Sequence, residues 1–414
     1  MPRPRRGRRE GVMRPLDGIR VLELTRVGPA AFATMMLADM GAEVLKIEPP
    51  SAGREPGTAN SPPPGEEQRA AALFLNRNKK SLTLDLKRPA GQQVLQELAR
   101  TADVLVEGFR PGVMARLGGD YETLARLNPR LVYCSLSGYG QDGPYRDYPG
   151  HDVNYIALAG LLGLIGESEG PPVIPLNIVA DLAGAAMHAV VGILLALYAR
   201  ERTGRGQLVD VSYLDTTIAL TTAVPTVAQF LSKGIPPARG KGLFSGRYAF
   251  YAVYETKDDK YISIGCVEPW LWHNFCDAIG RPDLKALALK PGDASSYAGE
   301  EHQRAREELA ALFRTRTRDE WFQILSQADV CVGSVYDVPE VLQDPQVRHR
   351  RMFLELEHPK AGRVIQPGIA IKLSETPGEV RSFAPCLGQH TEEVLRELGY
   401  DDARIAALRA DGVV

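Results

Sequence analysis

The sequence predicts an α/β protein: a large, open, parallel sheet of Rossmann-like type, joined to a smaller α/β domain. Strand-like and helix-like segments alternate through the first half of the chain, as parallel sheets with crossover helices require. The chain has 414 residues, more than one domain usually contains. A second set of strand and helix patterns begins near Gly240.

The first elements form a strand–helix–strand unit. Residues 19–24 and 43–48 alternate between apolar and polar side chains, as half-buried strands do. Residues 30–40 between them are mostly small and apolar, and Gly41 is suited to end a helix there. No G-x-G-x-x-G run follows the first strand, so we expect no dinucleotide cofactor.

The same alternation continues toward the middle of the chain. Strands are expected at residues 81–86, 104–107 and 131–136, and Pro89 begins a helix that reaches Arg100. A long helix starts at Asp181 and runs to about residue 202. Its most apolar part, residues 187–198, is too short to span a membrane.

These patterns divide the chain into five expected segments. They are a disordered basic tail (1–14), the first part of the large domain (15–205), a linker (206–239), the small domain (240–330), and a linker with a return to the large domain (331–414). The small domain contains a predicted hairpin, with strands at residues 250–254 and 261–264.

Composition excludes several classes of function. The net charge of −2 gives no global attraction for nucleic acid. Five cysteines without C-x-x-C spacing favour reduced thiols and a cytoplasmic location over a disulfide framework. The basic tail lacks the apolar run of a secretory signal. The histidines outside position 151 have no partners at metal-ligand spacing, so we expect no metal.

Three short stretches carry a family resemblance. Residues 146–155 read RDYPGHDVNY, residues 177–181 read NIVAD, and residues 267–269 read VEP. This text resembles the alpha-methylacyl-CoA racemases of the family III CoA-transferase superfamily, and the resemblance covers nearly the whole chain. It implies an acyl-CoA thioester as substrate, no separate cofactor, and two interlocked chains in a homodimer.

The candidate catalytic residues are His151, Asp181 and Glu268. A histidine and a carboxylate on opposite faces of a carbon atom can remove a proton from one face and deliver one to the other. The resemblance implies this exchange for His151 and Asp181, with Glu268 as partner of the histidine. Asp181 is also expected to cap its helix, whose free N–H groups would stabilise a thioester enolate.

Candidate binding residues fall into three groups. Lys79 belongs to a basic cluster suited to phosphates, although the same cluster fits a solvated turn equally well. The resemblance implies CoA contacts for Leu84, Asp85, Leu86, Lys87, Gly108 and Arg110, and substrate contacts for Gly150, Asp152, Asn154 and Tyr155. Asp152 could equally be a turn or cap carboxylate.

Two enzymatic readings and one non-enzymatic reading follow. The first is a racemase or epimerase of 2-methylacyl-CoA thioesters. The second is a CoA-transferase in which Asp181 is the nucleophile. Arg247, near the expected acyl pocket, favours a polar or carboxylated acyl group unless it is a surface residue. An acyl-CoA-binding module without catalysis would leave the histidine and both carboxylates unexplained.

Overall fold

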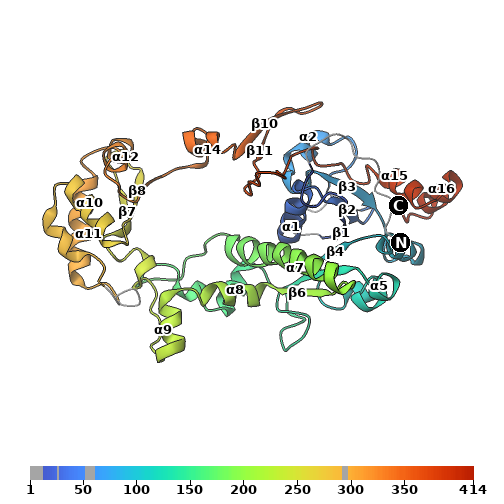
Figure 1. Cartoon of the computed structure of the whole chain (residues 1–414), viewed down its shortest axis with the longest axis horizontal. Helices are drawn as coiled ribbons and strands as arrows, with labels where there is room; N and C mark the ends of the chain where they lie inside the picture. Colours follow the sequence, from blue (N-terminus) through green and yellow to red (C-terminus); the bar gives the residue numbers. More distant parts are fainter. Residues whose placement is uncertain (1–12, 26–27, 52–60, 291–296) are drawn as a thin grey trace. The chain divides into compact units, whose positions relative to one another are not determined.

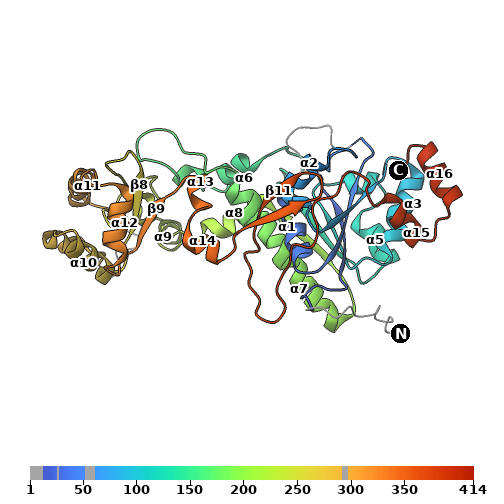
Figure 2. The same cartoon turned by 90° about the horizontal axis from the view of Figure 1, so that it is seen from above.

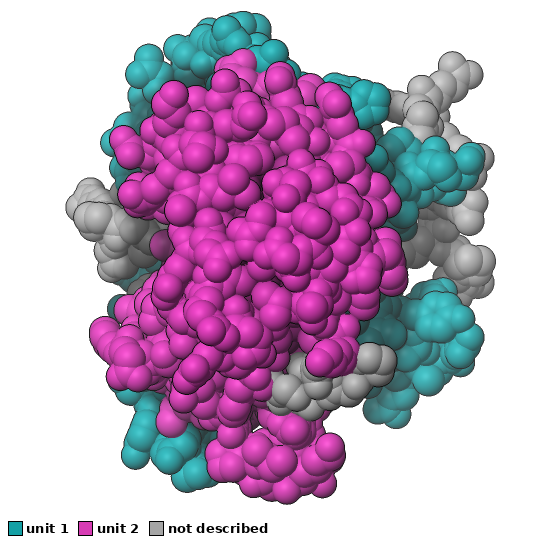
Figure 3. Space-filling view, turned by 90° about the vertical axis from the view of Figure 1, so that its left-hand side faces the viewer, with its two compact units in different colours: residues 1–155, 177–216, 346–414 teal, residues 156–176, 217–345 magenta. Residues whose placement is uncertain are grey.

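The computed structural model describes residues 13–25, 28–51, 61–290 and 297–414. Contacts divide the chain into two compact units, which Figure 3 colours separately. Unit 1 comprises Met1–Tyr155, Asn177–Thr216 and Gln346–Val414, and unit 2 comprises Ile156–Leu176 and Thr217–Pro345. The first part of the large domain was expected to be continuous to residue 205, whereas Ile156–Leu176 groups with unit 2. Most of the expected tail at residues 1–14 lies outside the described residues.

The elements of unit 1 can be followed in Figure 1. Its strands are β1 (Arg20–Leu24), β2 (Glu43–Glu48), β3 (Lys79–Thr83), β4 (Val104–Glu107), β5 (Val132–Ser137), β6 (Leu208–Ser212), β10 (Phe353–His358) and β11 (Gly362–Pro367). Its helices are α1 (Gly28–Asp39), α2 (Glu67–Ala72), α3 (Pro89–Ala99), α4 (Val113–Arg116), α5 (Tyr121–Leu127), the π-helical segment Ile178–Ala186, α7 (Met187–Thr203), α15 (Thr391–Glu397) and α16 (Asp402–Ala410). Three helices cross a unit boundary: α6 (Asp152–Leu158), α8 (Tyr213–Thr221) and α14 (Pro345–His349).

The main sheet of unit 1 has six strands in the order β3-β2-β1-β4-β5-β6. Every neighbouring pair is parallel. From β1 the chain adds β2 and then β3 toward one edge of the sheet. It then returns to the other side of β1 and adds β4, β5 and β6 toward the opposite edge. Ligands of such sheets bind outside the carboxyl ends of the strands, at the point where the order reverses. The fold therefore directs attention to the loops that follow β1 and β4.

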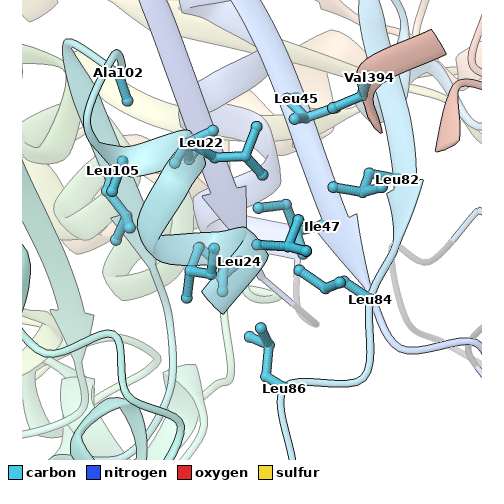
Figure 4. Packing of buried hydrophobic residues seen from close by; sticks show 14 of the residues in the cluster. Leu22, Leu24, Leu45, Ile47, Leu82, Leu84, Leu86, Ala102, Leu105 and Val394 are labelled. Carbon is cyan, nitrogen blue, oxygen red and sulfur yellow. The ribbon is translucent and has the colours of Figure 1, made fainter. Parts of the chain in front are cut away.

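An apolar core covers one face of this sheet. Figure 4 shows Leu22, Leu45 and Leu82, from β1, β2 and β3, beside Leu105 and Val394. The same cluster includes buried residues of α3, α5, α15 and α16. In Figure 2 these four helices lie to the right of the sheet, while α1 and α7 lie to its left. The C-terminal helices thus complete a core that the first half of the chain begins.

A long continuous helical run lies on the opposite face. The π-helical segment and α7 together span Ile178–Thr203, a run of 26 residues whose most apolar 18-residue stretch has a mean hydropathy of 2.0. By length and composition this run could cross a membrane, so the expected limit of residues 187–198 was too short. The run packs against α1, β5 and β6, and such helices also occur in the cores of water-soluble domains.

Unit 2 contains a second, antiparallel sheet of three strands in the order β7-β8-β9. Its elements are α9 (Pro225–Lys233), β7 (Tyr251–Glu255), β8 (Tyr261–Gly265), α10 (Pro269–Ala278), α11 (Glu300–Phe313), α12 (Arg318–Ser326), β9 (Val332–Val335) and α13 (Val338–Val341). The predicted hairpin corresponds to β7 and β8. The third strand, β9, lies beyond the expected end of the small domain at residue 330 and was assigned to a linker.

Candidate active site

Two cavities open at the carboxyl ends of the unit 1 strands. The first, which we call the His151 cavity, has a volume of about 460 Å³. The second, which we call the Lys87 cavity, has a volume of about 660 Å³. The loop Gly108–Arg110, directly after β4, lines both of them. Both cavities therefore adjoin the point where the strand order reverses, where the fold predicts a ligand.

The His151 cavity brings together most of the residues that the sequence singled out. His151 and Asp181 line it from two different segments of unit 1. Gly108, Arg110, Gly150, Asn154 and Tyr155 line it as well. A solvent-exposed imidazole and a half-buried carboxylate thus share one cavity, which is the pairing that proton transfer on two sides of a carbon atom needs.

A tight turn positions His151. The backbone N–H of His151 donates to Oδ1 of Asn154 over 3.0 Å. The backbone N–H groups of Asn154 and Tyr155 in turn donate to the carbonyl of His151. The side chain of Asn154 therefore fixes the turn that presents the imidazole at the start of α6.

Gly150 is required by the packing of Tyr155. The Tyr155 ring stacks on Tyr213 with centroids 5.0 Å apart and meets the edge of Tyr139 at 5.2 Å. A Cβ atom on Gly150 would lie only 2.6 Å from Cε1 of Tyr155 and 2.9 Å from the hydroxyl of Tyr139. Any side chain at this position would therefore displace the tyrosines behind His151.

Asp152, rather than Asp181, caps the helix that carries Asp181. Oδ2 of the buried Asp152 accepts the backbone N–H groups of Ala180 at 2.8 Å and of Asp181 at 2.9 Å. Asp181 lies inside the first turn, so the expectation that it is the N-cap was wrong. The amides of Ala180 and Asp181 are also occupied, so they are not the donors that would stabilise an enolate.

The pKa of Asp181 is raised above its ordinary value of 3.8. Burial is the main cause, and the negative charge of Asp152 adds to it, whereas a hydrogen bond from Asn177 and the nearby His151 act in the opposite direction. Nδ2 of Asn177 donates to Oδ2 of Asp181 over 3.3 Å. A raised pKa makes this carboxylate a stronger base, which suits proton abstraction.

The lining of the Lys87 cavity includes several cationic side chains. Leu84, Asp85, Leu86 and Lys87 follow β3 and line it together with Gly108 and Arg110. Arg116 of α4 lines it too, although the sequence analysis did not include it. Within the described ranges, Lys87, Arg110 and Arg116 form no side-chain ion pair. Three such cations together with apolar lining residues suit a nucleotide with phosphates.

Lys79 does not belong to this site. Its side chain is fully buried, and Nζ donates to Oε2 of Glu23 over 2.8 Å and to Oγ1 of Thr34 over 2.9 Å. The prediction that Lys79 binds phosphates is therefore corrected: this lysine links β3 to β1 and α1. The sequence around Lys79 resembled a basic turn because Glu23, whose carboxylate neutralises the lysine, lies 56 positions away in the chain.

Glu268 and Arg247 lie in unit 2. Glu268 is an exposed residue between β8 and α10, and its side chain forms no capping bond to that helix. Arg247 is half-buried between the short helical turn Leu243–Ser245 and β7. His151 and Asp181 belong to unit 1, so the pairing of Glu268 with His151 and the acyl role of Arg247 stay predictions.

A model of the family described as CoA-transferase family III matches residues 16–391. The chain belongs to this family. It is 35% identical over 402 residues to the human alpha-methylacyl-CoA racemase, covering 96% of this chain and 97% of that protein. It is 34% identical over 409 residues to the human succinyl-CoA:glutarate CoA-transferase, covering 97% of this chain and 90% of that protein. Racemases and transferases of this family are thus about equally similar to the chain.

A solved structure shows the same fold. The CAIB/BAIF family protein from Brucella suis superposes with a TM-score of 0.77 at 28% identity, covering 94% of this chain and 100% of that one. The resemblance of short sequence stretches to this superfamily is confirmed by the full-length comparison. The protein is therefore an enzyme of the family III CoA-transferase and racemase superfamily.

Proposed function

We propose that the protein is a cofactor-independent racemase or epimerase of 2-methylacyl-CoA thioesters. The thioester carbonyl acidifies the adjacent C–H bond. Asp181 or His151 removes the α proton from one face, the electron pair is delocalised onto the thioester oxygen as an enolate, and the other residue delivers a proton to the opposite face. Glu268 is proposed to support the histidine.

One observation carries this proposal: His151 and Asp181 line the same cavity. The two residues differ in kind, because one is an imidazole and the other is a carboxylate whose pKa is raised by burial. An acid and a base that coexist near neutral pH can exchange roles between the two directions of a racemisation. A purely nucleophilic aspartate would not require the histidine.

The second candidate is a CoA-transferase that uses the same aspartate. The carboxylate of Asp181 would attack the thioester carbonyl and expel CoA thiolate, leaving a mixed anhydride. The thiolate would then attack the aspartyl carbonyl, release the first carboxylic acid and leave an aspartyl-CoA thioester. The similarity to the human succinyl-CoA:glutarate CoA-transferase favours this candidate, as does the half-buried position of Asp181.

We also propose that the active protein is a homodimer. Helix α7 has an exposed apolar stripe in unit 1, formed by Met187, Val191, Leu194, Leu195 and Tyr198. Leu195 and Tyr198 are 63% and 61% exposed. Such a stripe on one long helix is unusual for a surface that faces only water. A second copy of the chain is the proposed partner.

The experiment that separates the two candidates uses His151→Ala. The wild type and the variant are each incubated with one enantiomer of a 2-methylacyl-CoA in deuterated water. The deuterium content and the chirality of the α carbon are followed together. For a racemase, His151→Ala should suppress inversion, while Asp181 still exchanges the proton on its own face. Asp181→Asn should lower the activity by about a hundredfold or more for either candidate, because racemisation and CoA transfer both require the carboxylate.

A transferase gives a different pattern. CoA exchange between carboxylic acids would survive His151→Ala, and hydroxylamine would trap a modified aspartyl enzyme in the presence of a CoA ester. Trapping in the wild type, a requirement for a carboxylate acceptor and no deuterium at the α carbon would together exclude the racemase. We expect deuterium incorporation without an acceptor.

A further inference from the structure

Glu107 ends β4 at the point where the two cavities meet. Its side chain is 5% exposed, and it precedes the loop Gly108–Arg110 that lines both cavities. Arg110, the cation of this loop, is exposed to solvent. Contacts that hold the backbone of this loop therefore also position Arg110 and the wall that the two cavities share.

The carboxylate of Glu107 holds the loop directly. Oε2 accepts the backbone N–H of Phe109 over 2.8 Å. Oε1 accepts the hydroxyl of Ser135 on the neighbouring strand β5. Ser135 in turn accepts Nε2–H of Gln141 over 2.7 Å. Since Glu107 pairs with Ser135 in the sheet register, the sheet itself anchors the carboxylate that holds the loop.

This carboxylate is surrounded by groups that do not neutralise it. Among the described residues it forms no ion pair with a lysine, arginine or histidine. Asp210 on β6 is paired with Ser135 in the sheet register and adds negative charge. The other titratable neighbours are Tyr133 and Cys134 on β5 and Tyr213 at the start of α8, and burial raises the pKa of each, so they stay neutral at pH 7.

Burial consequently raises the pKa of Glu107 to about 7, and Asp210 adds to this, although the hydrogen bonds from Ser135 and Phe109 oppose it. A group with such a pKa changes charge near neutral pH. An ionised acceptor forms a hydrogen bond roughly twice as strong as a neutral one. The bond that holds the loop is therefore stronger above pH 7 than below it.

We propose that Glu107 is a positioning residue whose ionisation sets the geometry of the Gly108–Arg110 loop and thereby the affinity of the protein for the CoA moiety. The proposal rests on the proposed function, because it assumes that CoA occupies the Lys87 cavity. Affinity for CoA is expected to fall as the pH decreases through the pKa of Glu107. The free energy of unfolding changes in the opposite direction. The folded state keeps the proton on Glu107 above the ordinary glutamate pKa of 4.5, and this contribution to stability is lost as the pH rises through about 7.

The test measures the dissociation constant of 3′-dephospho-CoA by calorimetry, about one pH unit above and one below 7. This probe is used because it lacks the terminal phosphate of CoA, whose own second pKa is about 6. The wild type should bind about fivefold more weakly at the lower pH, the effect of replacing a charge-assisted bond by a neutral one. The isosteric variant Glu107→Gln should bind with the weaker affinity at both values.

Two further variants make the result specific. Asp210→Asn removes the negative charge beside Ser135, so the pKa of Glu107 falls and the midpoint of the affinity change should move to lower pH. Glu122→Gln, an exposed carboxylate on α5, should reproduce the wild-type profile. Infrared spectroscopy should show a protonated carboxyl that titrates near pH 7 in the wild type and is missing in Glu107→Gln.

The possible failures are distinguishable. If Glu107→Gln keeps the full pH dependence of the wild type, the inference about Glu107 is wrong while CoA binding stands. If neither the wild type nor any variant binds dephospho-CoA or CoA, the proposed function fails and the inference with it. A wild-type affinity that does not change across this pH range likewise overturns the inference.

Discussion

At the scale of single residues, Asp152 connects the two halves of the candidate site. It follows His151 directly in the chain, and its carboxylate binds the backbone N–H of Asp181 from 29 positions away. Its other oxygen, Oδ1, is buried and accepts no hydrogen bond from the residues that the structure describes. Asp152 therefore both fixes the backbone of Asp181 and contributes to the raised pKa of the Asp181 carboxyl.

Asp152→Asn should shift the pH dependence of catalysis. The amide oxygen still accepts the two backbone N–H groups, but the negative charge beside Asp181 is gone, so the pKa of Asp181 falls. Because the base form of Asp181 is then present at lower pH, the acidic limb of kcat/KM for α-proton exchange should move to lower pH. Asp120→Asn is the matched control, since Asp120 caps α5 through the N–H of Thr123. An unmoved acidic limb would show that Asp152 does not tune Asp181.

Arg110→Ala should raise KM for CoA esters by about tenfold, the effect of losing one hydrogen bond to a charged group. Because the phosphates are remote from the reacting carbon, their binding is largely uniform, and kcat should change much less. Arg126→Ala, an exposed arginine of α5 that lines neither cavity, is the control. An unchanged KM for Arg110→Ala would show that the guanidinium does not contact the phosphates.

At the scale of elements, a buried ion pair joins β3 to β1, and a second buried ion pair lies within β2. Lys79 on β3 pairs with Glu23 on β1, and on β2 Lys46 lies 3.2 Å from Glu48. All four side chains are at most 1% exposed. Isolated charges at this depth would be very costly, so each depends on its partner.

Lys79→Met should reduce the free energy of unfolding by about 3–5 kcal/mol, because Glu23 would remain buried without its partner. The double variant Lys79→Met with Glu23→Gln should recover much of this loss. Denaturant unfolding measures both. Calorimetry on the folded double variant should give an unchanged affinity for CoA, whereas a large loss would restore Lys79 as a phosphate ligand.

The sequence predicted elements better than contacts between them. Alternating side chains identified β1 and β2, and the apolar run Val104–Val106, which is buried throughout, identified β4. The strand β6 falls in the segment that was assigned to a linker. It lies at the edge of the sheet, where Leu208 is exposed and only Val211 and Ser212 of the strand are buried. The capping of the Asp181 helix by Asp152 depends on a contact across 28 positions, from Ala180, which no local pattern reveals.

At the scale of the whole molecule, the sequence identified the family, whereas the interlocked homodimer that the resemblance implies stays a prediction. Short stretches around His151, Asp181 and Glu268 sufficed for the family, which the full-length match confirms. The predicted site residues did not include Tyr139, Arg146 or Tyr213. In the structure, Arg146 and Tyr213 line the His151 cavity and Tyr139 packs on Tyr155. Their positions depend on how distant loops converge at the end of the sheet.

Leu195→Glu should convert the proposed homodimer into a monomer. A charge in the middle of the apolar stripe on α7 would be desolvated in any interface that covers the stripe. Light scattering after size-exclusion chromatography measures the mass. Leu231→Glu, at a leucine of α9 that is 66% exposed, tests whether a charge on an exposed leucine is sufficient by itself. A wild-type protein that is monomeric at all concentrations would exclude the homodimer.

The close packing around Gly150 limits how this site can evolve. No side chain fits there while the rings of Tyr155 and Tyr139 stay in place. A lineage that gains a side chain at position 150 must therefore also lose ring volume at both positions 155 and 139. Each single step would be harmful and only the combination tolerable, so these three positions should change together or not at all.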